Sequence, residues 1–361
     1  MRTMLSIAGG LALSLASAAA QPPPLTTVFA AAHEGYSCFR IPALLSLGGG
    51  ELLAFAEGRK LSCADHGWND LVSKRSLDGG ASWGALQVVR SESAGDKLVT
   101  VGNPAPLLLA SGALLLPFCR NNLEVGVLRS DDRGHSWRLS ANVSVPPGWT
   151  WVATGPPGSI EVLRGGGRLV VPINFVNASV VDASTAFLSD DGGESWRLAD
   201  GIVRGGNENQ VAELAWRSNA TTPSVLHMTM RSAVTGSRLA AESADAGETW
   251  GEPWPTISET KCEGSVLALP RSRRLVMSSA FAAQQRANMT LHVSADDGHS
   301  WAPAAQVFAG PSAYSSLADL SPQSGAEDVV GLLFEQGPTS TYQTISFARV
   351  ALPAGGGAPS P

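Results

Sequence analysis

One eight-residue pattern, S-x-D-x-G-x-x-W, occurs five times and constrains the fold more than any other feature of the sequence. Its copies begin at Ser76, Ser130, Ser189, Ser243 and Ser294, so successive starts lie 54, 59, 54 and 51 residues apart. This period is too long for helical solenoid repeats. It suits an architecture in which each unit is one four-stranded propeller blade.

The chemistry of the pattern predicts a tight turn fastened to an apolar core. The aspartate can accept hydrogen bonds from nearby backbone amides, the glycine accepts a positive φ, and the tryptophan ring fills an apolar layer. Five recurrences at near-even spacing argue against unrelated polar turns. We therefore expect each copy to connect the third and fourth strands of a blade at its outer rim, and to serve stability rather than catalysis.

The repeat predicts an all-β fold, a six-bladed β-propeller of four-stranded antiparallel sheets. The 331 residues from Pro22 to Leu352 divide into six units of about 55, of which five carry the pattern. The sixth unit has three strand-like runs, at 314–320, 329–335 and 344–350. Residues 26–30 are expected to supply its fourth strand and close the ring without an open edge. The expected inner strands are the short apolar runs 52–56, 114–119, 169–173, 226–230 and 275–279.

Both ends of the chain differ in composition from the repeat region. Residues 1–20 combine a basic start, an apolar run and a small-residue segment, which predicts a secretory signal peptide cleaved after Ala18 or Ala20. An uncleaved anchor is the alternative. The propeller is assigned to residues 21–353, and the low-complexity residues 354–361 to a disordered tail. We expect a protein that is secreted or held in a lysosome-like lumen, with no integral membrane segment once the signal is removed.

The cysteines and the net charge narrow the chemistry. Cys38 and Cys63 lie beside unusual polar segments, where a disulfide would tie two loops together, whereas Cys119 and Cys262 lie in apolar runs typical of buried thiols. Four cysteines allow three full pairings, and all three remain open. No Cys/His cluster has the spacing of metal ligands, so we predict no catalytic metal and no cofactor. A net charge of −6 argues against nucleic acid as a partner.

Several arginines stand at the ends of strand-like runs. Arg40 follows Cys38-Phe39, Arg231 closes an apolar run, and Arg286 follows 55 residues later, one repeat on. Equivalent positions on successive blades point to one axial mouth, where guanidinium groups can converge on a planar anion such as a carboxylate. The alternative is that each is an ordinary surface or ion-paired residue. Arg120 is a further candidate that spacing does not exclude.

Together these motifs resemble those of one enzyme family. Phe39-Arg40-Ile41-Pro42 matches the FRIP motif, and the five repeats match the Asp boxes, of bacterial- and animal-type exo-sialidases of the six-bladed neuraminidase superfamily. Further matching segments are 54–59, 101–106, 167–172, 314–317 and 331–335. The resemblance covers nearly the whole predicted mature chain. The combination is more specific than Asp boxes alone, which also occur in other propellers.

The resemblance implies a carboxylate clamp and a tyrosine nucleophile. In that family three arginines hold the carboxylate of sialic acid, and the matching positions are Arg40, Arg231 and Arg286. The nucleophile is a tyrosine, matched by Tyr314, and its activating glutamate is matched by Glu213. A neutral phenol suits a substrate whose anomeric carbon bears a carboxylate, because an attacking anion would be repelled. Packing in a blade core is the alternative interpretation of Tyr314.

The resemblance also assigns an acid/base residue. Asp65 matches an aspartate on a mobile loop over the mouth, which protonates the leaving oxygen and then activates water. Asp70, at the start of a strand-like run, and His66 are the competing candidates.

Three more positions match residues around the clamp. Glu335 matches an acidic residue that pairs with Arg40, and Arg59 and Asn103 match residues that contact ring hydroxyls of the substrate.

The resemblance therefore implies a secreted, monomeric, retaining exo-α-sialidase. It would release terminal sialic acid from glycoproteins, glycolipids or oligosaccharides through a covalent tyrosyl-glycosyl intermediate. Two alternatives remain: a trans-sialidase with the same residues, and a propeller lectin that keeps only the arginine clamp. The joint presence of Asp65, Tyr314 and Glu213 favours an enzyme over a lectin, because a binding module needs no nucleophile.

Overall fold

A computed structural model describes residues 22–354, except 156, 157, 163–165, 218, 220–223, 234, 235, 283, 325 and 326. The predicted signal peptide and, apart from Ala354, the predicted tail lie outside the described residues. Within the described part of the chain, no helix is long and apolar enough to cross a membrane.

The described residues form an all-β structure of antiparallel sheets. The first sheet has the order β2 (Cys38–Gly48), β3 (Glu51–Arg59), β4 (Asn69–Ser76) and β5 (Gln87–Arg90). The second sheet has the order β10 (Arg138–Val143), β9 (Glu124–Ser130), β8 (Leu114–Arg120) and β6 (Val101–Gly102), and β7 (Leu107–Leu108) also pairs with β8.

The third and fourth sheets are formed by the strands in the middle of the chain, β11 to β20. The third has the order β11 (Trp149–Thr154), β13 (Arg168–Asn177), β14 (Val180–Ser189) and β15 (Arg197–Leu198), with β12 (Ile160–Val162) on β13 and β16 (Val203–Arg204) on β14. The fourth has the order β17 (Gly206–Glu213), β18 (Leu226–Ser232), β19 (Ser237–Ser243) and β20 (Trp254–Ser258).

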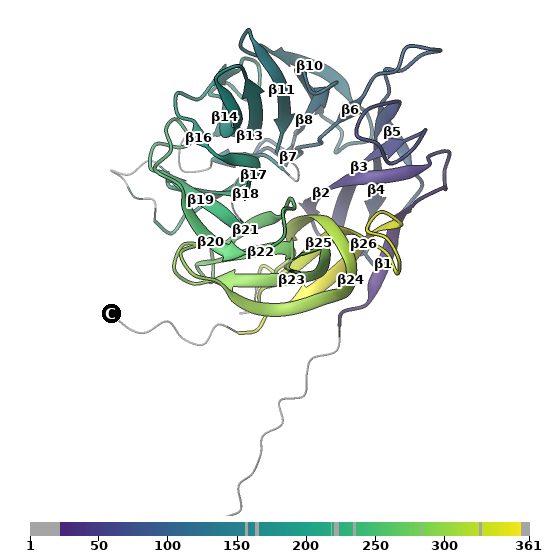
Figure 1. Cartoon of the computed structure of the whole chain (residues 1–361). Helices are drawn as coiled ribbons and strands as arrows, with labels where there is room; N and C mark the ends of the chain where they lie inside the picture. Colours follow the sequence, from purple (N-terminus) through teal and green to yellow (C-terminus); the bar gives the residue numbers. More distant parts are fainter. Residues whose placement is uncertain are drawn as a thin grey trace, which may run out of the picture.

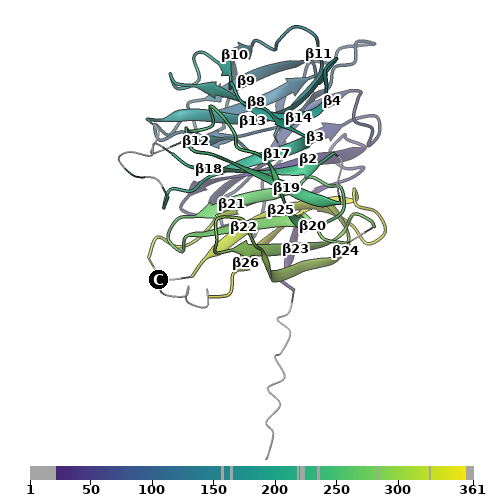
Figure 2. The ribbon, with the colours of Figure 1, turned by 60° about the vertical axis from the view of Figure 1, so that its left-hand side comes forward.

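The last sheet has seven strands and contains both ends of the described chain. Its order is β1 (Leu25–Ala30), β26 (Thr344–Ala351), β25 (Val329–Gln336), β24 (Ala302–Asp319), β23 (Ala287–Ser294), β22 (Arg274–Ala280) and β21 (Ser265–Leu269). β1 pairs with β26, which confirms the predicted closure of the ring by residues 26–30. Figures 1 and 2 show the sheets following one another around a central axis in chain order, a propeller-like arrangement.

The described residues form five sheets where the sequence predicted six, because β24 takes part in two sets of strands. Residues from Ala302 to Pro311 pair with β23, and residues from Ser312 to Asp319 pair with β25. The strand is 18 residues long and has no break between the two sets, so its hydrogen bonds join them into one sheet.

The repeated turns have the predicted place and chemistry. All five follow β4, β9, β14, β19 or β23 and precede the next strand. In the copy that begins at Ser189, Asp191 accepts hydrogen bonds from the backbone and hydroxyl of Ser195 at 2.9 and 2.5 Å. The Gly193 amide bonds the Ser189 hydroxyl at 2.9 Å, and Trp196 packs on an apolar cluster between blades. These side-chain contacts satisfy the backbone groups of a turn that pairs with no strand.

The predicted inner strands are one position farther from the axis than expected. The apolar runs lie in β3, β8, β13, β18 and β22, each the second strand of its set. A cavity of about 470 Å³ on the axis is lined instead by residues of β2, β17, β21 and β24. The second strand is covered on both faces by neighbouring sheets and is therefore apolar on both, whereas the axial strand borders the cavity.

Candidate active site

A second cavity, of about 410 Å³, gathers most of the predicted site residues. Its lining consists of Arg40, Asp65, Asn103, Trp151, Ala153, Asn174, Val176, Asp182, Asn207, Glu208, Arg231, Arg286, Tyr314 and Tyr342. Six of the nine predicted residues are among them. The exceptions are Arg59, Glu213 and Glu335, which do not line this cavity.

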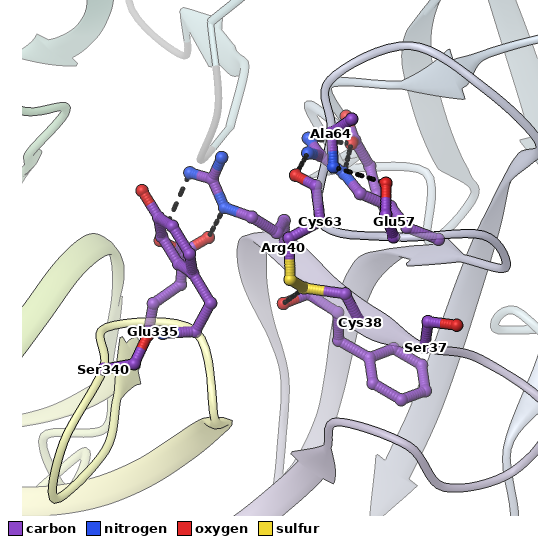
Figure 3. Close-up of a disulfide and its surroundings, with 12 residues drawn as sticks. Ser37, Cys38, Arg40, Glu57, Cys63, Ala64, Glu335 and Ser340 are labelled. Carbon is purple, nitrogen blue, oxygen red and sulfur yellow. Dashed lines mark hydrogen bonds and ion pairs between the residues drawn. A yellow bond between two sulfur atoms is a disulfide. The ribbon is translucent and has the colours of Figure 1, made fainter.

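Arg40 is held by a buried carboxylate behind it. The pairing of β2 with β3 shifts between Arg40 and Ala43, and Ile41 has a positive φ of 57°. Glu335, which is fully buried, accepts hydrogen bonds from Arg40 Nε and the Ile41 amide, both at 2.9 Å (Figure 3). The predicted ion pair between Arg40 and Glu335 is therefore confirmed. Although burial lowers the pKa of Arg40, the charge and hydrogen bond of Glu335 together with Tyr314 and Tyr342 outweigh it and raise that pKa well above its usual range.

The three predicted clamp arginines border the same cavity from different sheets. Arg231 near the end of β18 donates to Glu208 at 2.9 Å, and Arg286, just before β23, donates to the Tyr342 hydroxyl at 3.0 Å. The guanidinium of Arg40 lies 4.2 Å from the ring centroid of Tyr342. The cavity wall thus presents three guanidinium groups, which can form charge-assisted hydrogen bonds with a carboxylate.

Arg120 takes no part in this cluster. Its guanidinium pairs with Glu92 at 2.5 and 2.9 Å and with Glu124 at 2.6 Å, and it does not line the cavity.

Tyr314 lies in β24 with its hydroxyl against a carboxylate. Its side chain is buried, its backbone amide donates to Glu335 at 3.2 Å, and its hydroxyl donates a hydrogen bond to Glu208. Burial and the neighbouring charge of Glu208 raise the pKa of Tyr314 well above its usual range. The phenol is therefore neutral at ordinary pH, with a proton acceptor already in contact.

The predicted partnership of Tyr314 with Glu213 is wrong. Glu213 lies at the other end of β17, accepts a hydrogen bond from the Ser224 hydroxyl at 2.6 Å, and borders the axial cavity. A strand rises about 3.3 Å per residue, so the five positions between Glu208 and Glu213 span roughly 16 Å. The carboxylate beside Tyr314 is that of Glu208.

The antiparallel pairing of β17 with β18 could have indicated Glu208. In the β17–β18 hairpin Glu213 is opposite Leu226, at the far end of the strand from Arg231. Within this pair of strands, a carboxylate beside Arg231 therefore has to come from the beginning of β17, where Glu208 is the acidic residue.

Asp65 lies on the loop between β3 and β4 and reaches the edge of the cavity. Its side chain is 67% exposed and accepts from Arg59 Nη1 at 2.9 Å and Arg40 Nη1 at 3.4 Å. Partial burial raises its pKa, but Arg59 and Arg40 outweigh that effect and lower it. Asp70, the competing candidate, is buried and accepts from the Tyr36 hydroxyl at 2.9 Å. His66 packs edge-to-face on Trp151, with ring centroids 5.8 Å apart.

Arg59 does not have the predicted position. It is 2% exposed, does not line the cavity, and donates from Nε and Nη2 to Glu57 Oε2 at 2.9 and 2.7 Å. Its remaining nitrogen, Nη1, donates to the Cys63 carbonyl at 2.6 Å and to Asp65 at 2.9 Å. Asn103 does line the cavity, in a left-handed conformation with φ of 52°, and its amide donates to Glu57 Oε1 at 2.9 Å.

Three further polar residues line the cavity and were not predicted. Asn207 donates to Asp182 at 2.6 Å, and Asn174 in β13 is 2% exposed with no hydrogen-bond partner for its Oδ1. A buried polar atom without a partner is rare and indicates a place for a ligand or water. An asparagine inside the apolar run of β13 was the available signal in the sequence.

The structure also resolves the cysteine pairing that the sequence left open. Cys38 and Cys63 form a disulfide with their Cα atoms 5.2 Å apart (Figure 3), and Cys119 and Cys262 are buried free thiols. Among the described residues, no group of three or more His, Cys, Asp or Glu side chains is arranged to hold a metal ion.

The chain is similar to known sialidases. It is 28% identical over 355 residues to a sialidase of Micromonospora viridifaciens, a match that covers 88% of this chain and 52% of that protein. It therefore spans about half the length of that relative. Among solved structures it is similar to a Hadza microbial sialidase, with 25% identity and a TM-score of 0.78 over 91% of this chain and 68% of that one.

The fold is shared more widely, and a family assignment covers most of the chain. The intramolecular trans-sialidase from Ruminococcus gnavus is 16% identical with a TM-score of 0.69 over 90% of this chain and 96% of that one. Residues 49–323 match the family described as BNR repeat-like domain. This match spans more than half of the sequence and includes all five repeated turns. The chain belongs to the BNR repeat-like domain family, within the sialidase superfamily.

Proposed function

We propose that the chain is a secreted, retaining exo-α-sialidase that releases terminal sialic acid from glycoconjugates. One observation carries the proposal: Arg40, Arg231 and Arg286 border the same cavity as Tyr314, whose hydroxyl already contacts the Glu208 carboxylate. A sialic acid residue carries a carboxylate on the carbon that reacts. A clamp for the carboxylate therefore also brings the reacting carbon to the tyrosine.

In the first step the Tyr314 oxygen forms a bond to the anomeric carbon as the bond to the leaving oxygen breaks. Glu208 takes the phenol proton, and Asp65 gives a proton to the leaving oxygen. Because the pKa of Tyr314 is raised well above its usual range by burial and by Glu208, the phenol needs this base while attack proceeds. The positive charges of the clamp stabilise the carboxylate beside the developing oxocarbenium ion.

In the second step water replaces the tyrosine. The Asp65 carboxylate takes a proton from water, the oxygen of that water bonds to the anomeric carbon, and Glu208 returns its proton to Tyr314. Two inversions give net retention of configuration. The mechanism needs no metal or cofactor, since acid, base and nucleophile are side chains of this chain.

Asp65 must hold a proton to act as the acid, although its two arginine contacts lower its pKa. A substrate carboxylate bound by Arg40 would neutralise part of that positive charge. We infer that substrate binding itself raises the pKa of Asp65 and prepares it for proton transfer.

The proposal also includes six blades, secretion and a monomeric state. The switch of β24 from β23 to β25 supports two four-stranded blades within the seven-stranded sheet. Six separate segments border the axial cavity, at Leu44, Pro106, Ser159, Gln210, Val266 and Leu317, which supports the same number. The Cys38–Cys63 disulfide supports an oxidising compartment.

The decisive assay is hydrolysis of a fluorogenic α-sialoside, with product configuration followed by proton NMR. We expect release of the α-anomer first, insensitivity to EDTA, and a loss of more than about 10²-fold in kcat for Tyr314→Phe. Transfer to an added sugar acceptor instead of water would identify a trans-sialidase. Binding of sialosides with no turnover would identify a lectin and refute the proposal.

A further inference from the structure

We propose that the Cys38–Cys63 disulfide is a positioning device for Asp65, and that proton donation to the leaving group depends on it. The inference rests on the proposed function, because it assigns a purpose to the disulfide within that reaction. The bond joins the strand that carries Arg40 to the loop that carries Asp65 (Figure 3). Each cysteine precedes its site residue by two positions.

One end of the disulfide is rigid. Cys38 begins β2, is fully buried, and pairs in register with Arg59 of β3. Two residues later Arg40 is fixed through Glu335, independently of the disulfide. Opening the bond should therefore leave the carboxylate clamp in place.

The other end of the disulfide is on a loop with little packing of its own. Residues 61–66 are exposed, and Leu61, the apolar residue at its start, is 61% exposed. Besides the disulfide, hydrogen bonds hold the loop: Arg59 Nη1 to the Cys63 carbonyl at 2.6 Å, Asn69 Nδ2 to the Asp65 carbonyl at 3.1 Å, and the Gly67 amide to Thr100 at 3.0 Å. These bonds are partly buried, and each joins the exposed loop to one buried residue, so without the disulfide the loop would be held by a few polar contacts and little apolar packing.

Substrate binding makes the disulfide more important. In the free protein the Asp65 carboxylate is held by Arg59 and by Arg40. Arg40 is also a member of the clamp, so a bound carboxylate competes with Asp65 for it. Asp65 then keeps one ion pair, and the disulfide is the covalent link that keeps its backbone next to the cavity.

Reduction of the bond is simple thiol exchange. Cys63 is the exposed end, so a dithiol such as dithiothreitol can attack there, form a mixed disulfide, and close to its own cyclic disulfide while both cysteines become thiols. The loop is then released, and nothing else in the described site contains a disulfide.

The test compares two substrates that differ in their need for an acid. The leaving group of an aryl sialoside with a strongly acidic phenol departs as a phenolate without being protonated. The alkoxide of an alkyl sialoside has to be protonated as it departs. For the Cys38→Ala/Cys63→Ala variant we expect kcat/KM to fall about 10- to 100-fold on the alkyl sialoside and less than about threefold on the aryl sialoside. Dithiothreitol should produce the same selective loss in the wild type and no change in the double variant. Cys119→Ala, which removes a buried thiol that forms no disulfide, is the matched control.

Two further measurements separate positioning from loss of fold. Hydrogen exchange should become faster in residues 60–68 and stay unchanged in β2, and the affinity for a carboxylate-bearing inhibitor should stay within about threefold. Equal losses on both substrates, or no loss on either, would overturn the inference while leaving the sialidase assignment intact. Failure of the oxidised wild type to turn over any sialoside would overturn the proposed function and this inference with it.

Discussion

Exchanging Glu208 for glutamine tests which carboxylate activates Tyr314. The glutamine side chain keeps the shape of the glutamate and can still accept a hydrogen bond from the Tyr314 hydroxyl, but it cannot take the proton. Burial is the largest cause of the raised pKa of Tyr314 and persists in the variant, so ionisation of the phenol without a base stays negligible near neutral pH. The variant therefore removes the acceptor while keeping the contact.

The expected size follows from the role of the residue. A positioned general base contributes about 10²- to 10⁴-fold, which corresponds to roughly 3 to 5 kcal/mol of transition-state stabilisation. Glu208 also pairs with Arg231 at 2.9 Å, and its neutralisation leaves that guanidinium free for the substrate carboxylate. We therefore expect the loss in kcat, with KM unchanged or lower.

The matched control is Glu213→Gln, at the other end of the same strand. Steady-state kinetics on a fluorogenic sialoside should give a kcat for this variant within about twofold of the wild type, and thermal unfolding should establish that both variants are folded. The reasoning fails if Glu213→Gln loses as much activity as Glu208→Gln. It also fails if Glu208→Gln keeps more than about a tenth of the wild-type kcat.

Three other predictions concern stability and substrate contacts. Asp191→Ala removes the acceptor for Ser195 in one repeated turn and should lower the thermal midpoint by a few degrees with kcat unchanged; a folded variant without turnover would contradict this separation of roles. Asn174→Ala should raise KM about 3- to 10-fold without loss of stability, because its buried Oδ1 has no partner in the free protein; a drop in urea midpoint with normal KM would argue for a structural role. Burial lowers the pKa of His227 to about 3 and that of His292 to about 4, so between these values and 6.5 the unfolded chain binds protons that the folded chain does not. The free energy of unfolding therefore keeps the full contribution of both histidines above pH 6.5 and falls as pH decreases, by up to about 1.4 kcal/mol per pH unit for each histidine. Urea unfolding measured at several pH values should show a weaker pH dependence of this free energy for His227→Gln than for the wild type.

Features made by residues close in the sequence could be predicted from the sequence alone. Each repeated turn is built by residues within eight positions of one another, so its hydrogen bonds do not depend on the rest of the fold. The closing strand at the N-terminus was predicted by counting strands, since the last unit has three strand-like runs and residues 26–30 supply the fourth. The regular period also placed Arg231 and Arg286 at one mouth.

Contacts between sheets were decided only by the tertiary structure. The base beside Tyr314 depends on which end of β17 faces the cavity, and a motif match at Glu213 does not contain that information. Arg59 was predicted to contact the substrate, but it supports Asp65 because Glu57, on the same strand, holds its guanidinium inside the sheet. The disulfide partner of Cys38 likewise follows from the path of a loop and not from spacing.

The sequence by itself thus determined the repeated turns, the all-β class and the end of the molecule where the arginines meet, because these follow from neighbours along the chain and from a period. The tertiary structure decided the base, the support of Asp65 and the merging of two sets of strands through β24. These depend on strand register and on side chains brought together from distant residues, and a single chemical pattern is compatible with more than one such arrangement.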